Sequence, residues 1–254
     1  MRRPLTPQPG TVLGGPLVHL DEIASTNDRG RELALAGAPH GTVVIAERQT
    51  AGRGRQGRTW TAPGGRALTL SVLARMEASR MELLPLAVAL AVCEACERAT
   101  PVRCEVKWPN DVWIDARKVA GILIEARPQE EWAIVGIGLN VDTAPEDFPD
   151  ELRETATSLR IATGAAVDRE AVVGALFGRL AGWLDELGRP GRVTAAFRER
   201  DVLYGKTVAW MRDSRRMSGE ARGIDDDGAL VVFTGDAEVH LDAGEVHLER
   251  PSGA

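Results

Sequence analysis

The chain contains little cysteine and little histidine, and this limits the chemistry available to it. Its three cysteines, Cys93, Cys96 and Cys104, are an odd number crowded into one segment, so they cannot form the disulfide framework of a secreted scaffold. Cys93 and Cys96 form a CxxC pair inside an apolar stretch with no second Cys or His pair nearby, which favours core packing over a metal or redox site. The four histidines are scattered. We therefore expect a protein of a reducing compartment, the cytoplasm, without a histidine-based metal centre.

Long apolar runs and a basic charge excess are also missing. The longest apolar stretch, 83–96, is interrupted by Pro85 and Glu94 and is too short to span a bilayer. The first residues include two arginines without a following apolar run, so they do not resemble a secretory signal. The formal net charge of −6 disfavours a protein that coats nucleic acid, because that task needs a basic face. We expect neither a membrane nor a nucleic acid as a partner.

What the chain does contain is enough apolar sequence for a sizeable core. Its 254 residues, 44% of them hydrophobic, can form one large domain or a larger and a smaller one. Neither an internal repeat nor a low-complexity tract is visible. We divide the chain into a flexible N-terminal tail over 1–16, a main domain over 17–202 and a C-terminal domain over 203–254.

Helix-like and strand-like patterns alternate along the main domain and predict a mixed α/β (α+β) fold. Ser25 and Asp168 are suitable N-cap residues, and Gly37 and Gly188 suit helix ends. Helices are predicted over 28–36, 81–98 and 168–187. Strands are predicted over 42–47, 67–73, 105–107, 112–114, 121–125 and 132–141, with a polar turn at 115–118. After about residue 203, short β-like runs broken by Asp and Gly predict a small all-β module.

The first segment that suggests chemistry is a loop rich in glycine and arginine over 52–60, here called the flap. Its glycines allow backbone N–H groups to converge on an anion, and its arginines can add charge-assisted bonds to phosphate or carboxylate. Trp60 indicates a loop that closes over a ring rather than a freely solvated one. Residues 52–59 nearly match a P-loop, but 60–65 cannot continue as the helix that a P-loop must open. We reject that alternative.

Two further segments combine polar residues with apolar strands. Lys118 stands where a short turn enters an apolar strand, so its ammonium can lie at the edge of a dry pocket and stabilise developing negative charge. Asn110 and Asp111, taken alone, are ordinary turn formers. Gly136 and Gly138 interrupt a strand, where glycine commonly marks the close approach of a ligand; a β-bulge is the alternative.

Taken together, these segments resemble the biotin protein ligase family. The resemblance rests on five motifs in matching order and spacing: Ser-Thr-Asn at 25–27, the flap, Lys-Trp-Pro-Asn-Asp at 107–111, the strand starting at Lys118, and Gly-Ile-Gly-Leu-Asn at 136–140. It covers roughly 17–248. The fold implied is a class II aminoacyl-tRNA synthetase-like domain with a mixed sheet, followed by an SH3-like β-barrel.

The resemblance also implies roles for individual residues. Lys118 and Arg53 would be catalytic, and Asp111 would be a ligand of Mg²⁺. The residues implied in biotin binding are Ser25, Thr26, Asn27, Gln49, Gly52, Arg53, Gly54, Arg55, Lys118, Gly121, Gly136 and Gly138. Those implied in binding ATP or the adenylate are Arg55, Arg58, Trp60, Asn110, Asp111 and Asn140.

The activity implied is that of a biotin protein ligase. Such an enzyme would convert biotin and ATP, with Mg²⁺, to biotinyl-5'-AMP and pyrophosphate, and then transfer biotin to a lysine of the biotin carboxyl carrier domain of a carboxylase. Because the anhydride is already activated, no protein nucleophile is needed. The glycines of 52–59 predict a flap that is mobile without ligand. The protein is expected to be a monomer or a weak homodimer.

Two departures from the family pattern affect these expectations. Some relatives begin with a helix-turn-helix DNA-binding domain, which 16 tail residues cannot form, so no repressor role is expected. Gln56 stands where some members have a basic residue. Two alternatives stay open: a lipoate ligase, which shares the fold and the acyl-adenylate chemistry, and a binding module without turnover that uses the arginines of the flap.

Overall fold

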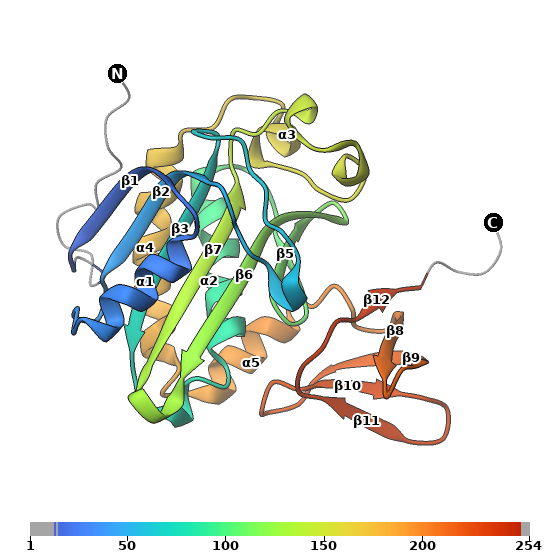
Figure 1. Cartoon of the computed structure of the whole chain (residues 1–254). Coiled ribbons are helices and arrows are strands. Elements are labelled where there is room, and N and C mark those ends of the chain that lie inside the picture. Colours follow the sequence, from blue (N-terminus) through green and yellow to red (C-terminus); the bar gives the residue numbers. More distant parts are fainter. Residues whose placement is uncertain (1–12, 14, 250–254) are drawn as a thin grey trace.

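The computed structural model of the chain describes Leu13 and residues 15–249, which form two β-sheets with helices around the first (Figure 1). The tail expected over 1–16 lies mostly outside the described residues. Leu13 is fully buried in the hydrophobic core. Within the described part of the chain, no helix is long and apolar enough to cross a membrane.

The larger sheet has seven strands and is mixed. Its order is β1-β2-β3-β7-β6-β5-β4, with β1 parallel to β2 and every other pair antiparallel. The strands are β1 (Leu17–Ile23), β2 (Val43–Gln49), β3 (Ala67–Arg75), β4 (Glu105–Lys107), β5 (Asp111–Ile114), β6 (Arg117–Arg127) and β7 (Trp132–Asn140).

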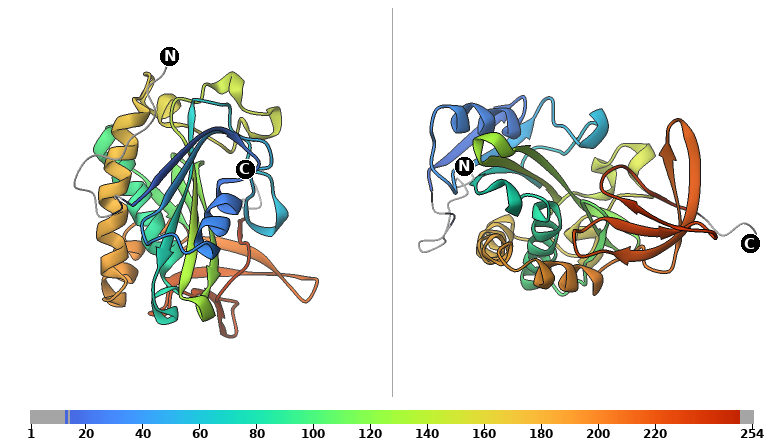
Figure 2. Two further views of the ribbon diagram at one scale, coloured as in Figure 1. Left: turned by 60° about the vertical axis from the view of Figure 1, so that its left-hand side comes forward. Right: turned by 90° about the horizontal axis from the view of Figure 1, so that it is seen from below.

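Helices cover the sheet unequally (Figures 1 and 2). On one face lie α2 (Leu84–Ala99), α4 (Arg169–Glu186) and α5 (Pro190–Arg198), and α1 (Thr26–Leu35) lies across β2, β3 and β7 on the other. Because α2 is packed between the sheet and α4, its sequence is apolar around most of its circumference. Cys93, Cys96 and Cys104 are buried and unbridged here, which confirms the prediction of core packing.

A second, five-stranded antiparallel sheet forms the C-terminal module, in the order β11-β10-β9-β8-β12. Its strands are β8 (Thr207–Arg212), β9 (Arg215–Ile224), β10 (Leu230–Phe233), β11 (Glu238–Leu241) and β12 (His247–Leu248). Trp108 Nε1 donates a 3.0 Å hydrogen bond to the carbonyl of Gly228, and Arg198 Nε donates one of 3.1 Å to the carbonyl of Ile224. These bonds attach the module to the main domain.

The predicted mixed α/β main domain and β-rich module are therefore confirmed, with local corrections. The turn expected at 115–118 consists only of Asp115 and Ala116, both with positive φ, and β6 already begins at Arg117. Helix α2 starts at Leu84 rather than at 81, because Pro85 suits the first turn of a helix and 78–80 form a separate 3-10 turn. Pro190 opens α5, a helix that was not predicted. The short helices are α3 (Leu159–Thr163) and the 3-10 turns Arg55–Gly57, Ala78–Arg80, Pro128–Glu130, Pro145–Asp147 and Asp150–Leu152.

Candidate functional site

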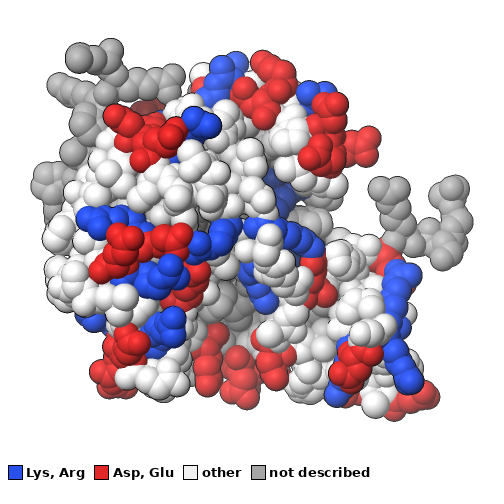
Figure 3. Space-filling model, in the orientation of Figure 1, with Lys and Arg blue, Asp and Glu red and all other residues white. Residues whose placement is uncertain are grey.

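A cavity of about 890 Å³ lies against the α1 face of the large sheet, a volume typical of small-molecule sites. Its walls come from the start of α1, the flap, strands β4 to β7, the segment 148–156 and residues 244–249 of the C-terminal module. Every residue expected to bind biotin or nucleotide lines it except Gly52. In Figure 3 a band of Lys and Arg crosses the middle of this face.

One end of the cavity is organised by a hydrogen-bond network at the start of α1. Gln49 Oε1 accepts from the backbone N of Thr26 at 2.7 Å and from its hydroxyl at 3.0 Å. Ser71, 1% exposed, has its hydroxyl 2.8 Å from Thr26 Oγ1 and 2.6 Å from Asn27 Oδ1. Asn27 Nδ2 donates to Glu125 Oε2 at 3.2 Å. The polar groups at this end are therefore held in fixed orientations by the protein itself.

The strand glycines line the cavity and also make room for protein side chains. A Cβ at Gly136 would overlap the side-chain amide of Asn27, and one at Gly138 would overlap the indole of Trp60. A Cβ at Gly121 would lie 3.0 Å from Lys118 Nζ. The strand register runs unbroken through Gly136 and Gly138, so the alternative of a bulge is wrong. Gly52 lets the chain pass close to the backbone of Trp60.

The flap is a compact loop rather than the start of a helix. Arg53 and Thr59 form an antiparallel bridge, and Gly54 N donates a 2.7 Å hydrogen bond to the carbonyl of Arg58. Between them the chain turns through Gln56 and Gly57, whose φ values are 55° and 75°. This geometry agrees with the rejection of a P-loop.

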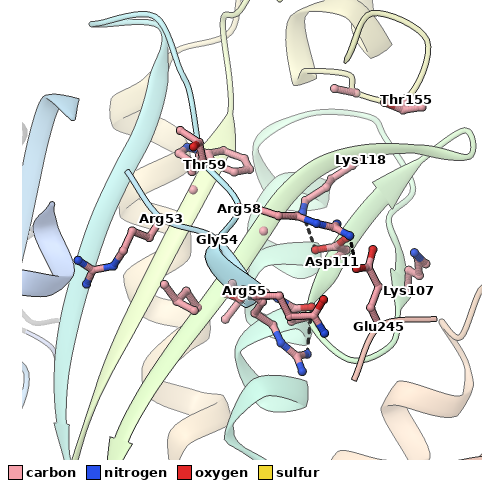
Figure 4. A pocket seen from close by; sticks show the side chains of 18 of the residues that line it. Arg53, Gly54, Arg55, Arg58, Thr59, Lys107, Asp111, Lys118, Thr155 and Glu245 are labelled. Carbon is pink, nitrogen blue, oxygen red and sulfur yellow. Dashed lines mark hydrogen bonds and ion pairs between the residues drawn. The ribbon is translucent and has the colours of Figure 1, made fainter. Parts of the chain in front are cut away.

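The three arginines of the flap have different anchors (Figure 4). Arg53 pairs with both oxygens of Asp28, at 2.7 and 2.9 Å, and with Glu125 at 3.1 Å. Its side chain therefore points toward α1 and away from Lys118. Arg55 Nη1 donates to Asn110 Oδ1 at 3.4 Å, and Arg58 forms an ion pair with Glu245 of the C-terminal module.

Charged neighbours and burial shift the pKa values of these groups. The hydrogen bond to Asp28 raises the pKa of Arg53, and the same contact lowers that of Asp28. Burial lowers the pKa of the half-buried Arg55 and of Lys107, although Asp111 and Glu245 oppose both shifts. Cations here are thus partly desolvated, which strengthens their attraction to an anionic ligand.

Lys118 lies at the centre of the cavity wall. Its Nζ is 2.7 Å from Asp111 Oδ1 and 5.9 Å from the centroid of the Trp60 ring, within cation–π range. Its backbone N donates to Thr155 O, and its carbonyl accepts from Thr157 N, both at 2.8 Å. The lysine predicted from sequence is therefore anchored through its backbone to the segment around Ala156, with which it forms a parallel bridge.

The two asparagines expected to bind the nucleotide also form hydrogen bonds within the protein. Asn110 Nδ2 donates to the carbonyl of Ile122 at 2.5 Å, which ties the 107–111 segment to β6. Asn140 is 4% exposed, and its Nδ2 donates to the carbonyl of Thr157 at 3.0 Å. Both line the cavity.

Sequence reasoning missed several lining or supporting residues. Ser71, Lys107 and Glu245 received no role, and neither did the wall formed by 148–156. Lys107 lies 5.4 Å from the Trp113 ring centroid, and its place in the 107–111 motif was the one available signal. The others carry no motif, because only tertiary contacts bring them to the site.

Among the carboxylates that line the cavity is that of Asp111, the residue expected to bind a divalent cation. Within the described residues no group of three or more His, Cys, Asp or Glu side chains could hold a metal ion. Mg²⁺ commonly binds through one or two carboxylates together with substrate phosphates and water. The residues present therefore fit a cation that arrives with a phosphorylated ligand.

Comparison with protein families gives two matches. Residues 20–142 match the model described as the biotin/lipoate A/B protein ligase family, and 204–248 match the biotin protein ligase C terminal domain. The chain is 35% identical to a Mycobacterium tuberculosis protein named biotin--[acetyl-CoA-carboxylase] ligase, over 90% of this chain and 89% of that protein. It is 34% identical to a Bacillus subtilis protein named bifunctional ligase/repressor BirA, over 93% of this chain and 75% of that protein.

Solved structures with the same fold include ligand complexes. The Aquifex aeolicus biotin protein ligase in complex with biotin and ATP is 30% identical, with a TM-score of 0.80, and the match covers 92% of this chain and 99% of that one. The Leishmania major biotin protein ligase in complex with biotinyl-5-AMP is 27% identical, with a TM-score of 0.60, and covers 92% and 98%.

Proposed function

The chain belongs to the biotin protein ligase family, and from this membership we propose that it activates biotin with ATP and transfers the biotinyl group to a lysine of a carboxylase carrier domain. One observation carries the proposal: flap residues Arg55 and Arg58 and the amine of Lys118 face one cavity of small-molecule size. The named activities of the Mycobacterium tuberculosis and Aquifex aeolicus relatives support the same assignment.

Biotin has an uncharged ureido ring, an apolar chain and a carboxylate, and the cavity offers a matching series of surfaces. At the α1 end, Ser25, Thr26 and Gln49 supply the donors and acceptors that a neutral urea needs. Leu70, Ile122 and Ile137 provide an apolar wall between that end and Lys118. We place the carboxylate near Lys118.

In the first step a carboxylate oxygen of biotin attacks the α-phosphorus of ATP. A bond forms between that oxygen and phosphorus, the bond from phosphorus to the bridging oxygen breaks, and pyrophosphate leaves. Lys118, Arg55 and Arg58 would stabilise the negative charge that develops, because fixed cations in a partly dry site need little reorganisation. The indole N–H groups of Trp60 and Trp113 are buried and have no hydrogen-bond partner among the described residues.

Mg²⁺ would neutralise phosphate charge when it is bound with the nucleotide. Asp111 is the protein ligand that we propose for it.

In the second step the deprotonated amine of the acceptor lysine attacks the carbonyl carbon of the mixed anhydride. The bond from that carbon to the phosphate oxygen breaks, AMP leaves with the electron pair, and the amine nitrogen releases one proton to solvent as the amide forms. Between the steps the flap would exclude water, which otherwise hydrolyses the anhydride.

The test is pyrophosphate release from ATP, measured with biotin, with lipoate and with neither acid, followed by transfer to a purified biotin carboxyl carrier domain. We expect a burst with biotin and mass addition of one biotinyl group to the carrier. A burst with lipoate but not with biotin would replace this proposal by the lipoate ligase alternative, and no burst with either would favour a binding module.

A further inference from the structure

The ion pair between Arg58 and Glu245 joins the flap to the C-terminal module. Arg58 comes from the loop over the cavity, whereas Glu245 lies between β11 and β12 and reaches into the cavity from the opposite side (Figure 4). The carboxylate side chain is 24% exposed and the guanidinium side chain 59% exposed. The pair therefore closes one end of the site with residues from both parts of the chain.

Other cations surround the same carboxylate. The charge of Glu245 raises the pKa values of Arg55 and Lys107, whereas burial lowers the pKa of both side chains. His247 lies 3.5 Å from Oε1 of Glu245. The remaining acid that acts on both Arg55 and Lys107 is Asp111, which already pairs with Lys118.

These cations form an anion-binding site that the carboxylate of Glu245 already occupies. Desolvated cations destabilise a fold unless negative charge compensates them, and here Glu245 supplies part of it. A diphosphate or triphosphate offers more charge and more acceptor oxygens to the same guanidinium and ammonium groups. A phosphate that binds Arg58 would repel the carboxylate of Glu245, because both groups are negatively charged.

We propose that Glu245 occupies, in the ligand-free protein, the place of the terminal phosphates of the nucleotide, and that a polyphosphate must displace it from Arg58. The proposal rests on ATP being the substrate of this site. Departure of pyrophosphate then lets Glu245 return to Arg58, which fastens the flap to the C-terminal module over the newly formed adenylate. The C-terminal module would thereby sense whether the site holds polyphosphate.

The test measures binding of inorganic pyrophosphate by isothermal titration, without biotin or acceptor. Glu245→Gln keeps the shape and removes the competing charge, so we expect pyrophosphate to bind about tenfold more tightly than to the wild type. Glu220→Gln is the matched control: Glu220 is in the same module, pairs with Arg222 at 3.2 Å and lies outside the cavity. We expect it to change the affinity less than twofold.

A double-mutant cycle shows whether Glu245→Gln acts by removing the ion pair with Arg58 or only by making the whole site more positive. In an Arg58→Gln background there is no pair to break, so Glu245→Gln should improve pyrophosphate binding less than twofold. The same tenfold gain in both backgrounds, or unchanged or weaker binding to Glu245→Gln, overturns the proposal. Glu245→Ala serves as a second variant, with thermal unfolding as the check on folding. If the pyrophosphate affinities of the variants agree with this cycle but biotin causes no pyrophosphate release from ATP, the proposed function fails and the proposed anion site stands.

Discussion

Lys118 Nζ lies 2.7 Å from Oδ1 of Asp111, and the backbone of this lysine is hydrogen-bonded to both Thr155 and Thr157 in the adjoining segment. The short ion pair and the two backbone hydrogen bonds together fix the position of the positive charge of Lys118. Thr155 and Thr157 lie in a segment that carries no recognisable motif. The location of the Lys118 amine thus depends on a wall that the sequence motifs do not include.

Replacing Lys118 tests its role in the first step. Lys118→Ala is expected to lower kcat for biotin-dependent pyrophosphate release on the order of 10²-fold, because it removes a charge partner of the transition state. Biotin affinity, measured by isothermal titration, should change much less. Lys206→Ala, at an exposed lysine of the C-terminal module, should leave both values unchanged. An unaltered release rate in Lys118→Ala would remove this lysine from the mechanism.

Gly138 is expected to control the position of Trp60. In Gly138→Ala the new methyl group overlaps the indole, and because Gly138 lies in the central strand β7, the ring must move. We expect weaker binding of both biotin and ATP, on the order of tenfold, measured by titration. Gly178→Ala is the control: it lies in α4, and outside its own helix no atom of the described residues lies within 4 Å of its new Cβ. It should leave binding unchanged and raise helix stability by about 0.5–1 kcal/mol.

The flap is expected to be mobile until ligands bind. It has few backbone bonds, among them Gly54 N to Arg58 O and Trp60 N to Gly52 O, and its arginines are anchored through side chains. Hydrogen exchange should therefore be fast at 54–59 in the free protein and at least about tenfold slower with biotin and ATP. Equal protection with and without ligands would contradict this prediction.

The sequence could predict the elements that carry the motifs but not the way the cavity is closed. Lys118, Asp111 and the arginines of the flap belong to local patterns whose residue types already indicate anion chemistry. Ser71 is one serine in an apolar strand, and Glu245 is one acid in a β-rich module. Their roles arise from contacts across the sheet and between modules, which no local pattern records.

The strand glycines illustrate the same limit. Gly136 and Gly138 correctly indicated a close approach, because a Cβ is excluded at both positions. The sequence could not tell whether a ligand or a side chain approaches. Only the packing of α1 and the flap on the sheet shows that Asn27 and Trp60 occupy those places.

Asp201 should make stability depend on pH. Burial raises its pKa to about 6 from 3.8, although the hydrogen bond that Oδ1 accepts from Leu203 N opposes this shift. The buried Oδ2 has no hydrogen-bond partner among the described residues. The folded chain then holds this proton more tightly than the unfolded chain, so the free energy of unfolding falls as pH rises from about 4 to about 6. Asp201→Asn should remove that loss and stabilise the protein at pH 7 on the order of 1 kcal/mol. Denaturant unfolding measures it.

The matching control for Asp201 is the exposed Asp236, where Asn should leave the pH profile unchanged. If Asp201→Asn and the wild type keep a constant difference in stability between pH 4 and 7, Asp201 does not carry the burial penalty.

Ser71 is expected to position the urea end of the cavity without touching the ligand. Ser71→Ala takes away the hydroxyl between Thr26 Oγ1 and Asn27 Oδ1, and buried partners left unpaired cost about 1–3 kcal/mol of stability. Thr69→Val, two residues earlier on β3, removes a hydroxyl that donates a hydrogen bond to the carbonyl of Ala46. Both variants should lower the unfolding free energy. Only Ser71→Ala should also weaken biotin binding, by about tenfold, because only that hydroxyl orients side chains that line the cavity. Equal biotin affinities in the two variants would show that Ser71 acts on stability alone.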